Sequence, residues 1–311
     1  MTTALYSHAS ALGHVTPPGH PESTSRYEAV QTALSDAHFR SLDRREAPRA
    51  DRGEVLRCHP ESYLAKVEAA IPATGWASLD GDTHVMAGSL EAALRGLGGC
   101  CAAVDAVLAG EASNAFVTMR PPGHHAETET AMGFCLFGNA AIAAKRALDH
   151  HGLSRVAVLD FDVHHGNGTQ DLLWNEARTL FASSHQMPLY PGSGSIHETG
   201  AHDNVLNVPL APMTGGVEMR RAWADMILPA VDDFAPELVI ISAGFDAHAA
   251  DPLANLNWST EDFAWLTKAI CDVADAHSKG RVVSTLEGGY DLNALAASVA
   301  AHVSVLMERG A

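Results

Sequence analysis

The sequence predicts a three-layer α/β protein in which helices cover both faces of one parallel sheet. The chain has 311 residues, of which 47% are hydrophobic and 18% are charged. This composition supplies a large buried core and excludes a disordered chain. Short apolar, β-branched runs alternate with longer helical patterns, as in consecutive βαβ units. No repeat, low-complexity tract or Pro/Ser-rich linker divides the sequence, so we expect residues 1–311 to form a single domain.

Five apolar runs are the predicted strands, and their continuous hydrophobicity is typical of strands with both faces covered. Ala-rich helical patterns lie between the runs. One spans Ser89–Gly110, with Ser89 expected as the N-cap and Gly110 just past the C-terminus, and another spans Asn139–His151. Helical crossovers between strands imply parallel pairing. The predicted strands are Asn114–Met119, Arg155–Asp160, Thr179–Ser183, Glu237–Ser242 and Arg281–Leu286.

Charge and cysteine content exclude several functional classes. Twenty Lys and Arg against 37 Asp and Glu give a formal charge of -17, which disfavours nucleic acid and anionic membranes as partners but not a cationic substrate. The N-terminal residues do not resemble a signal peptide, and no run approaches about 18 apolar residues. Five cysteines without Cys-x-x-Cys spacing predict buried thiols, not disulfides or a thiolate zinc site. We therefore expect a cytoplasmic protein.

Polar clusters occur at or just after the carboxyl end of each predicted strand. In open parallel sheets this edge is where ligands bind. The chain also has 18 histidines, many of them in these clusters. We therefore predict one composite active site. The clusters are Arg120–His125, Asp160–His165, Ser183–His185, Ala243–His248 and Glu287–Tyr290.

The Asp160-x-Asp162-x-His164 pattern favours a metal site. Residues two apart share a face of extended backbone, so these side chains can converge. Asp246, at the end of another strand, adds a carboxylate. One imidazole and two carboxylates with open positions are typical of a catalytic zinc or ferrous ion. The alternative is that these groups only cap helices and pair with one another.

Two further clusters indicate catalysis near that metal. His124 and His125 follow a turn-rich Arg120-Pro-Pro-Gly segment, and beside a metal-bound water one imidazole can move a proton while the other supplies charge. Tyr290 follows two glycines that allow close backbone approach, and its hydroxyl can donate to an oxyanion. In isolation, the histidines would be interpreted as a surface pair and Tyr290 as a packing residue.

Together these motifs closely resemble the zinc-dependent histone deacetylase and acetylpolyamine amidohydrolase superfamily, in its class II-like bacterial form. The resemblance covers nearly the whole chain in the family's order. It implies the arginase–deacetylase fold, with a central, mostly parallel eight-stranded sheet. The matching segments are Gly19-His-Pro-Glu22 with Arg26, His59–Leu64, Arg120–His125, Asp160–Gln170, Ser242–Asp246 with Asp251-Pro-Leu253, and Glu287–Tyr290.

The resemblance also implies the ions and the catalytic residues. His125 is then the general base and later the acid, and Tyr290 stabilises the oxyanion. Asn167 stands beside His125 where class I deacetylases carry Asp and class II-like members carry Asn. The resemblance further implies His124 paired with Asp160, one Zn²⁺ on Asp162, His164 and Asp246, and a K⁺ held largely by backbone oxygens of Asp160, Asp162, His164, Ser183 and Ser184.

For the substrate, the resemblance implies a tunnel formed by Gly133 and Phe134 with Tyr190 opposite, where many relatives carry Phe. Asp82 matches a rim acid that binds substrate. The expected reaction is hydrolysis of the acetyl or short acyl amide of lysine side chains, polyamines or related amines. The sequence leaves open whether the substrate is a small molecule or an acyl-lysine protein, and whether the chain forms a homo-oligomer.

Two other functions are compatible with part of these motifs. Arginase-like ureohydrolases share the fold but use two manganese ions, and they need a second carboxylate two residues after the position of Asp246. Here that residue is His248, which favours a single metal. A non-catalytic acyl-lysine reader would keep the pocket but lose Tyr290 or the histidine pair, and this chain keeps both.

Overall fold

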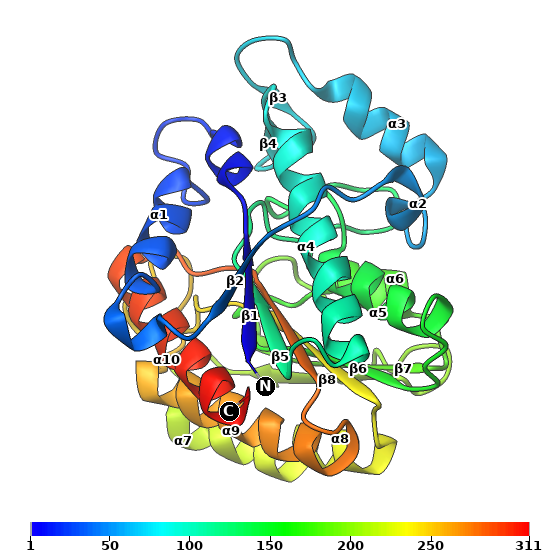
Figure 1. Ribbon diagram of the computed structural model, residues 1–311, viewed down its shortest axis with the longest axis vertical. Helices are drawn as coiled ribbons and strands as arrows, with labels where there is room; N and C mark the ends of the chain where they lie inside the picture. The colour runs from blue at the N-terminus through cyan, green and yellow to red at the C-terminus, as the bar shows by residue number, and fades with distance from the viewer. Residues whose placement is uncertain (1, 311) are drawn as a thin grey trace.

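An eight-stranded sheet forms the middle layer of the structure (Figure 1). The computed structural model describes residues 2–310. The strand order is β2-β1-β5-β10-β9-β6-β7-β8, and all neighbouring pairs are parallel. The α/β class and the eight-stranded sheet are therefore confirmed. The strands are β1 (Thr3–Ser7), β2 (Asp43–Glu46), β5 (Asn114–Val117), β6 (Val156–Asp160), β7 (Thr179–Gln186), β8 (Val205–Leu210), β9 (Leu238–Ala243) and β10 (Val282–Leu286).

Helices cover both faces of this sheet. One face packs against α1 (Thr24–Ala33), α7 (Gly216–Ala222), α8 (Leu228–Phe234), α9 (Thr260–His277) and α10 (Leu292–Gly310), with a π-helical turn (Trp223–Ile227) between α7 and α8. The other face packs against α4 (Ser89–Ala109), α5 (Asn139–Asp149) and α6 (Asn167–Leu173). A smaller cluster beside α4 and α5 includes residues of α2 (Arg52–Val55), α3 (Glu61–Ala70) and the hairpin β3 (Ala77–Ser78) and β4 (His84–Val85). Two 3-10 turns complete the structure, Ala9–Gly13 and Ala37–Phe39.

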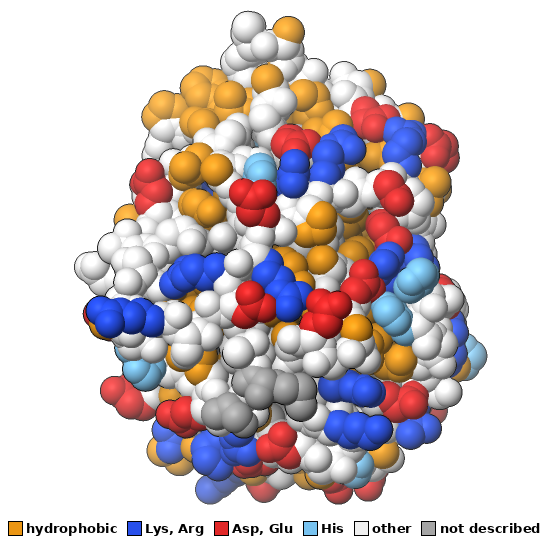
Figure 2. Space-filling view, in the orientation of Figure 1, with side chains coloured by type: hydrophobic (Ala, Val, Ile, Leu, Met, Phe, Trp, Pro, Cys, Tyr) orange, Lys and Arg blue, Asp and Glu red, His pale blue; other side chains and the backbone are white. Residues whose placement is uncertain are grey.

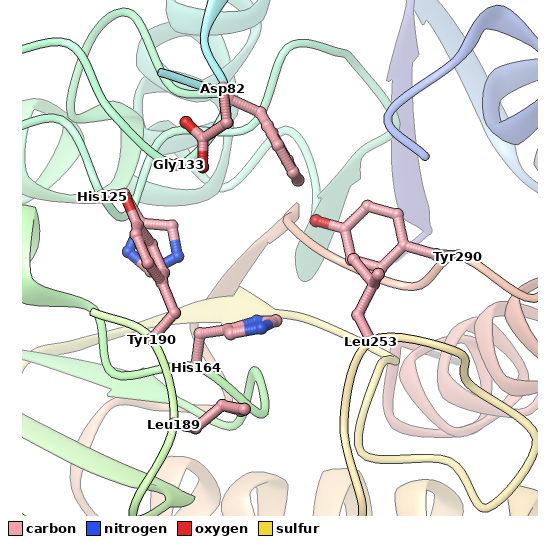
Figure 3. A pocket seen from close by; sticks show the side chains of 9 residues that line it. Asp82, His125, Gly133, His164, Leu189, Tyr190, Leu253 and Tyr290 are labelled. Atoms are coloured by element: carbon pink, nitrogen blue, oxygen red, sulfur yellow. The ribbon is translucent and has the colours of Figure 1, made fainter. Parts of the chain in front are cut away.

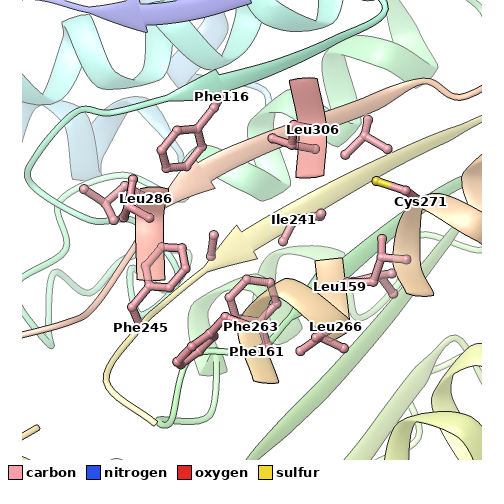
Figure 4. Packing of buried hydrophobic residues seen from close by; sticks show 14 of the residues in the cluster. Phe116, Leu159, Phe161, Ile241, Phe245, Phe263, Leu266, Cys271, Leu286 and Leu306 are labelled. Atoms are coloured by element: carbon pink, nitrogen blue, oxygen red, sulfur yellow. The ribbon is translucent and has the colours of Figure 1, made fainter. Parts of the chain in front are cut away.

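Alternate residues of each central strand serve the two faces of the sheet. In β9, Val239 and Ile241 belong to one buried apolar cluster and Ile240 to the other. Figure 4 shows part of the first cluster, in which the rings of Phe245 and Phe263 have centroids 5.2 Å apart. Because both faces are buried, the strands are apolar throughout, which is the pattern found in the sequence.

The five predicted strands are present, with ends shifted by a few residues. Strand β7 is longer than predicted because its last residues pair with β8, up to Gln186 opposite Leu210. The segment Ser183–His185 therefore lies inside a strand and not after its end, contrary to the prediction.

The ends of α4 show one wrong prediction and one confirmed one. Gly88, not Ser89, is the N-cap. The Ser89 hydroxyl instead accepts from the Met86 backbone N–H at 2.8 Å and lies 2.7 Å from Nδ1 of His14. At the other end Gly110 adopts a left-handed conformation, φ 76°, as a glycine after a helix commonly does.

Helix α4 is apolar because it belongs to the core. Of the helices in residues 2–310, it alone is long and apolar enough to cross a membrane, and 72% of its most apolar window is buried inside the protein. The five cysteines are free thiols. Four of them are buried, as predicted from the sequence, and Cys58 is half-buried.

His302, on α10, is a fully buried histidine remote from the predicted site. Its Nδ1 lies 2.7 Å from the Thr267 hydroxyl and its Nε2 lies 2.9 Å from the Ser284 hydroxyl. Burial lowers the pKa of His302 to about 3. The ring is therefore neutral in the folded protein, whereas the unfolded chain takes up a proton below about pH 6.5. The free energy of unfolding should consequently fall as the pH drops from about 6.5 toward 3.

We expect His302→Gln to lose this part of the pH dependence. Between pH 7 and pH 5 its free energy of unfolding should fall by roughly 2 kcal/mol less than that of the wild type. Denaturant unfolding at the two pH values measures both falls. Equal falls in the two proteins would contradict the assignment.

The surface carries charges of both signs. Figure 2 shows basic and acidic side chains interspersed over one face, with no large area of basic side chains. Ion pairs at the surface include exposed Arg49 with Glu91 at 2.8 Å. On this face, therefore, no basic area compensates for the excess of acidic residues in the chain.

Candidate active site

The loop after β6 carries most of the predicted metal motif. The strand ends at Asp160, and the following residues form bends. The Asp162 N–H donates to Asp160 Oδ1 at 3.0 Å, and the His164 N–H donates to Asp162 Oδ1 at 2.9 Å. Phe161 and Val163 are fully buried in the core. Polar and core-facing side chains alternate here as predicted. The alternation comes from local side chain–backbone hydrogen bonds and not from an extended strand.

Asp162, His164 and Asp246 form a buried group that can hold a metal ion. Their potential ligand atoms all lie within 4.8 Å of one another, and no other such group occurs in residues 2–310. His164 Nδ1 is 3.1 Å from an oxygen of each carboxylate.

Electrostatics favour a cation at this position. Burial disfavours a charged imidazole, but the two carboxylates outweigh it and raise the pKa of His164 to about 10. Burial and the nearby Asp162 carboxylate raise the pKa of Asp246 to about 7. Two carboxylates repel each other in a buried site, and a bound cation relieves that repulsion. The N and O donors fit zinc or a similar divalent ion.

His248 does not contribute to this group. Its Nδ1 accepts from the Ala250 N–H at 3.1 Å, and its Nε2 lies 3.5 Å from the Thr260 hydroxyl. A ureohydrolase would need a metal-binding carboxylate at this position. The donor set therefore matches one metal ion and not a pair.

His124 is paired with Asp160, as the family resemblance implied. Its Nδ1 is 3.0 Å from Asp160 Oδ2, and its Nε2 is 3.8 Å from Asp162 Oδ2. Although burial opposes protonation, the carboxylates of Asp162 and Asp160 raise the pKa of His124 well above its usual value. His124 is therefore suited to carry a fixed positive charge. Asp160 contacts this histidine and lies outside the metal-binding group.

His125 is held in place by Asn167. Asn167 Nδ2 donates to Glu127 Oε1 at 2.7 Å, so the Asn167 carbonyl oxygen faces His125 and accepts from its Nδ1 at 2.7 Å. This contact leaves Nε2 with the free lone pair. Burial, and the positive charge of His124, lower the pKa of His125 well below its usual value. The pKa values of the two adjacent histidines are thus shifted in opposite directions, a division that acid–base catalysis uses.

Glu287 holds the histidine segment, a role that the sequence analysis missed. Its Oε2 accepts from the backbone N–H of Gly123 at 2.7 Å and of His124 at 3.1 Å. The side chain is fully buried at the end of β10, and burial raises its pKa to about 7. The sequence feature that could have indicated this role is the acidic residue Glu287 directly after a strongly apolar strand.

Tyr290 lies on the opposite side of the pocket from His125, and its hydroxyl points into the pocket (Figure 3). Gly288 passes so close to the Asp162 and Asp246 carboxylates that a Cβ there would lie 2.1 Å from Asp246 Oδ2. Gly289 has φ 120°, a conformation that L residues rarely adopt. Burial raises the pKa of Tyr290 well above its usual value, so the phenol keeps its proton.

A pocket of about 230 Å³ opens above these groups. The predicted Asp82, Gly133, Phe134 and Tyr190 all line it. A Cβ on Gly133 would lie 2.3 Å from His125 Cδ2, so only glycine fits there. The remaining wall residues, Leu189 and Leu253, were not predicted from the sequence.

Aromatic rings line this pocket. The Phe134 ring has its centroid 5.9 Å from that of Tyr290, and the Tyr190 ring has its centroid 5.2 Å from that of His125. Burial and the adjacent Asp80 raise the pKa of Asp82, the one acidic residue in the wall. The pocket therefore suits a narrow apolar chain with a polar end.

Two of the residues expected to bind a monovalent cation are neighbours across the sheet. Asp160 pairs with Ser183 between β6 and β7. The Ser183 hydroxyl lies 2.9 Å from His185 Nδ1, and the Ser184 hydroxyl accepts from Trp223 Nε1 at 2.9 Å. Both hydroxyls already have protein partners.

Residues 20–306 match the family model described as the histone deacetylase domain. The chain belongs to the histone deacetylase family. The domain of this family is hydrolytic, so the protein is an enzyme. The match confirms the family resemblance found in the sequence motifs.

Individual relatives agree with this assignment. The chain is 42% identical over 286 residues to the histone deacetylase-like amidohydrolase of Pseudomonas aeruginosa, covering 89% of this chain and 75% of that one. It is 37% identical over 298 residues to a probable deacetylase of Archaeoglobus fulgidus, covering 94% and 82%. The crystal structure of the HDA15 HD domain is similar with a TM-score of 0.94 at 31% identity, covering 99% and 89% of the two chains.

Proposed function

We propose that the protein is a zinc-dependent amidohydrolase that removes an acetyl or other short acyl group from an amine. One observation carries the proposal. A neutral imidazole, His125, fixed by Asn167, lines the same pocket as His164 of the buried Asp162–His164–Asp246 group. An acyl-lysine reader would need the pocket but would have no use for this arrangement.

The side chains divide the chemistry between them. Zinc, when bound by Asp162, His164 and Asp246, polarises the amide carbonyl and makes water nucleophilic near neutral pH. His125 takes the proton of the attacking water on Nε2, while Asn167 holds Nδ1.

His125 then gives that proton to the leaving amine, which releases the free amine and a carboxylic acid. His124, charged beside Asp160, stabilises the negative charge that develops. The Tyr290 hydroxyl donates to the amide oxygen as that oxygen gains charge.

The pocket supports substrates with an aliphatic chain between the amide and a polar group. Phe134 and Tyr190 would contact the methylenes, and Asp82 would accept a hydrogen bond from a backbone amide or an ammonium group. Acyl-lysine and acylated polyamines both have this form. Turnover of acetyl-lysine peptides, N-acetylpolyamines and simple alkyl acetamides by the purified enzyme would separate them. We expect the simple acetamides to be the poorest substrates.

We also propose a structural K⁺ bound mainly by backbone oxygens of the residues implied by the family. The parallel pairing of Asp160 with Ser183 supports this assignment because it brings the two backbone segments together. Since both serine hydroxyls have protein partners, the carbonyl oxygens are the available ligands. The set is Asp160, Asp162, His164, Ser183 and Ser184.

For its cellular setting we propose the cytoplasm, with a small-molecule or acyl-lysine substrate and no nucleic acid or membrane as partner. The charge of -17 supports this, because polyanionic partners would be repelled. The free cysteines fit a reducing compartment.

Tyr290→Phe should lower kcat by roughly 10²- to 10³-fold and leave KM nearly unchanged, because it deletes one donor to the developing oxyanion. Tyr190→Phe is the matched control, since it removes a hydroxyl from the other tyrosine of the pocket and should leave kcat close to wild type. Steady-state kinetics of both variants measure this. Unchanged kcat in Tyr290→Phe would remove Tyr290 from the mechanism.

A further inference from the structure

Asp251 is a buried acid that the mechanism above does not use. It lies in the loop after β9 and is 8% exposed. Its two carboxylate oxygens face different segments. Oδ2 accepts from the Tyr290 backbone N–H at 2.7 Å, and Oδ1 accepts from the Leu253 backbone N–H at 3.0 Å. Oδ2 also lies 3.3 Å from the Asp291 N–H.

These contacts join two segments of one wall of the pocket. Tyr290 follows β10 and Leu253 follows β9, and both line the pocket on the same side (Figure 3). A carboxylate that accepts backbone N–H groups makes charge-assisted hydrogen bonds, which are shorter and stronger than neutral ones. Among residues 2–310, the Asp251 side chain is the only one that accepts a hydrogen bond from the backbone N–H of Tyr290.

The Tyr290 segment needs such a contact because its backbone is unusual. Gly289, directly before it, has φ 120°. On the other side, Arg26 Nε donates to the Gly289 carbonyl at 2.6 Å, and the Arg26 guanidinium carbon lies 4.9 Å from the centre of the Tyr290 ring. Arg26 therefore fixes the residue before Tyr290 and contacts its ring, while the Tyr290 N–H itself depends on Asp251.

We propose that Asp251 is a positioning residue for catalysis, which sets the place of the Tyr290 hydroxyl by holding the Tyr290 backbone. The inference rests on the proposed function, in which that hydroxyl donates to the amide oxygen. A shift of about 1 Å in a positioned group can lower a rate by roughly 100-fold. Asp251 is not among the residues that line the pocket.

The test is a double-mutant cycle on the zinc-loaded enzyme with one acetylated substrate. Asp251→Ala should lower kcat by about 10- to 100-fold, with little change in KM and with the metal retained. In the Tyr290→Phe background the same substitution should lower kcat by less than about threefold, because no hydroxyl is left to misplace. Equal losses in the two backgrounds, or wild-type kcat in Asp251→Ala, would overturn the proposal.

Asp291→Ala is the matched control. Asp291 is the next residue after Tyr290, and its carboxylate caps α10 by accepting from the N–H groups of Asn293 and Ala294 at 3.1 and 2.8 Å. Its loss should lower thermal stability and leave kcat close to wild type. A loss of kcat equal to that of Asp251→Ala would assign the effect to general loosening of the segment and contradict the proposal.

If Asp251→Ala does not fold, Asp251→Asn keeps the side-chain shape and enters the same cycle. Hydrogen exchange tests the contact without any variant, since the Tyr290 amide of the wild type should be protected. Exchange as fast as that of a free amide would overturn the proposal. A folded, zinc-loaded wild type that hydrolyses no amide would instead overturn the proposed function.

Discussion

His125→Ala should abolish nearly all turnover while the metal stays bound. In the proposed reaction this imidazole accepts the proton of water and returns it to the amine, so one substitution removes both steps. General acid–base groups contribute about 10²- to 10⁴-fold each, and we expect a loss at or above the upper end of that range. Single-turnover rates and elemental analysis of the same preparation measure the two quantities.

His124→Ala is the natural control for this experiment. His124 is adjacent in sequence and its ring centroid is 4.0 Å from that of His125, but it is paired with Asp160. Its removal should cost charge stabilisation and leave a measurable rate. If either variant loses the metal, we have mistaken a ligand for a catalytic group. If His124→Ala loses more activity than His125→Ala, their roles are reversed.

Asp246→Ala should lose both the metal and all detectable activity. The side chain provides one of three donors, and its removal leaves a buried Asp162 and His164 without the third ligand. Wild-type protein should contain one divalent ion per chain, and the variant should contain much less than one. Asp171→Ala is a suitable control, because the Asp171 carboxylate accepts a hydrogen bond from the Thr128 backbone N–H at the protein surface. Full metal content in Asp246→Ala would contradict the ligand assignment.

The central part of the fold could be predicted because burial leaves a clear signature. The five predicted strands are β5, β10, β9, β6 and β7, which are contiguous in the sheet. Strand β2 was missed because it reads Asp43-Arg-Arg-Glu46 and lies at an edge, where a polar sequence is compatible with a strand. Strand β8 is the opposite edge and contains Pro209, which argues against a strand in sequence.

Most of the predicted site residues come together because they follow or end parallel strands, whose ends meet at one edge. Asp82, between β3 and β4, and Ser183 and Ser184, inside β7, are the exceptions. Leu189 and Leu253 were not assigned to the pocket, although Leu253 belongs to a matching segment, because a leucine in a loop gives no chemical signal of its own. Glu287 and Asp251 escaped for another reason. They act on backbone N–H groups of distant segments, Glu287 on Gly123 and Asp251 on Tyr290, and such pairings are set by the tertiary structure.

The most direct test of the account is a metal titration of amide hydrolysis. Protein stripped of metal with a chelator is incubated with an acetylated amine, and the acetate released per minute is followed as zinc is added. One buried group of three donors predicts no activity without metal and a rate that saturates at one equivalent of zinc per chain. Full activity in the metal-free protein, or saturation only at two equivalents, would contradict the account.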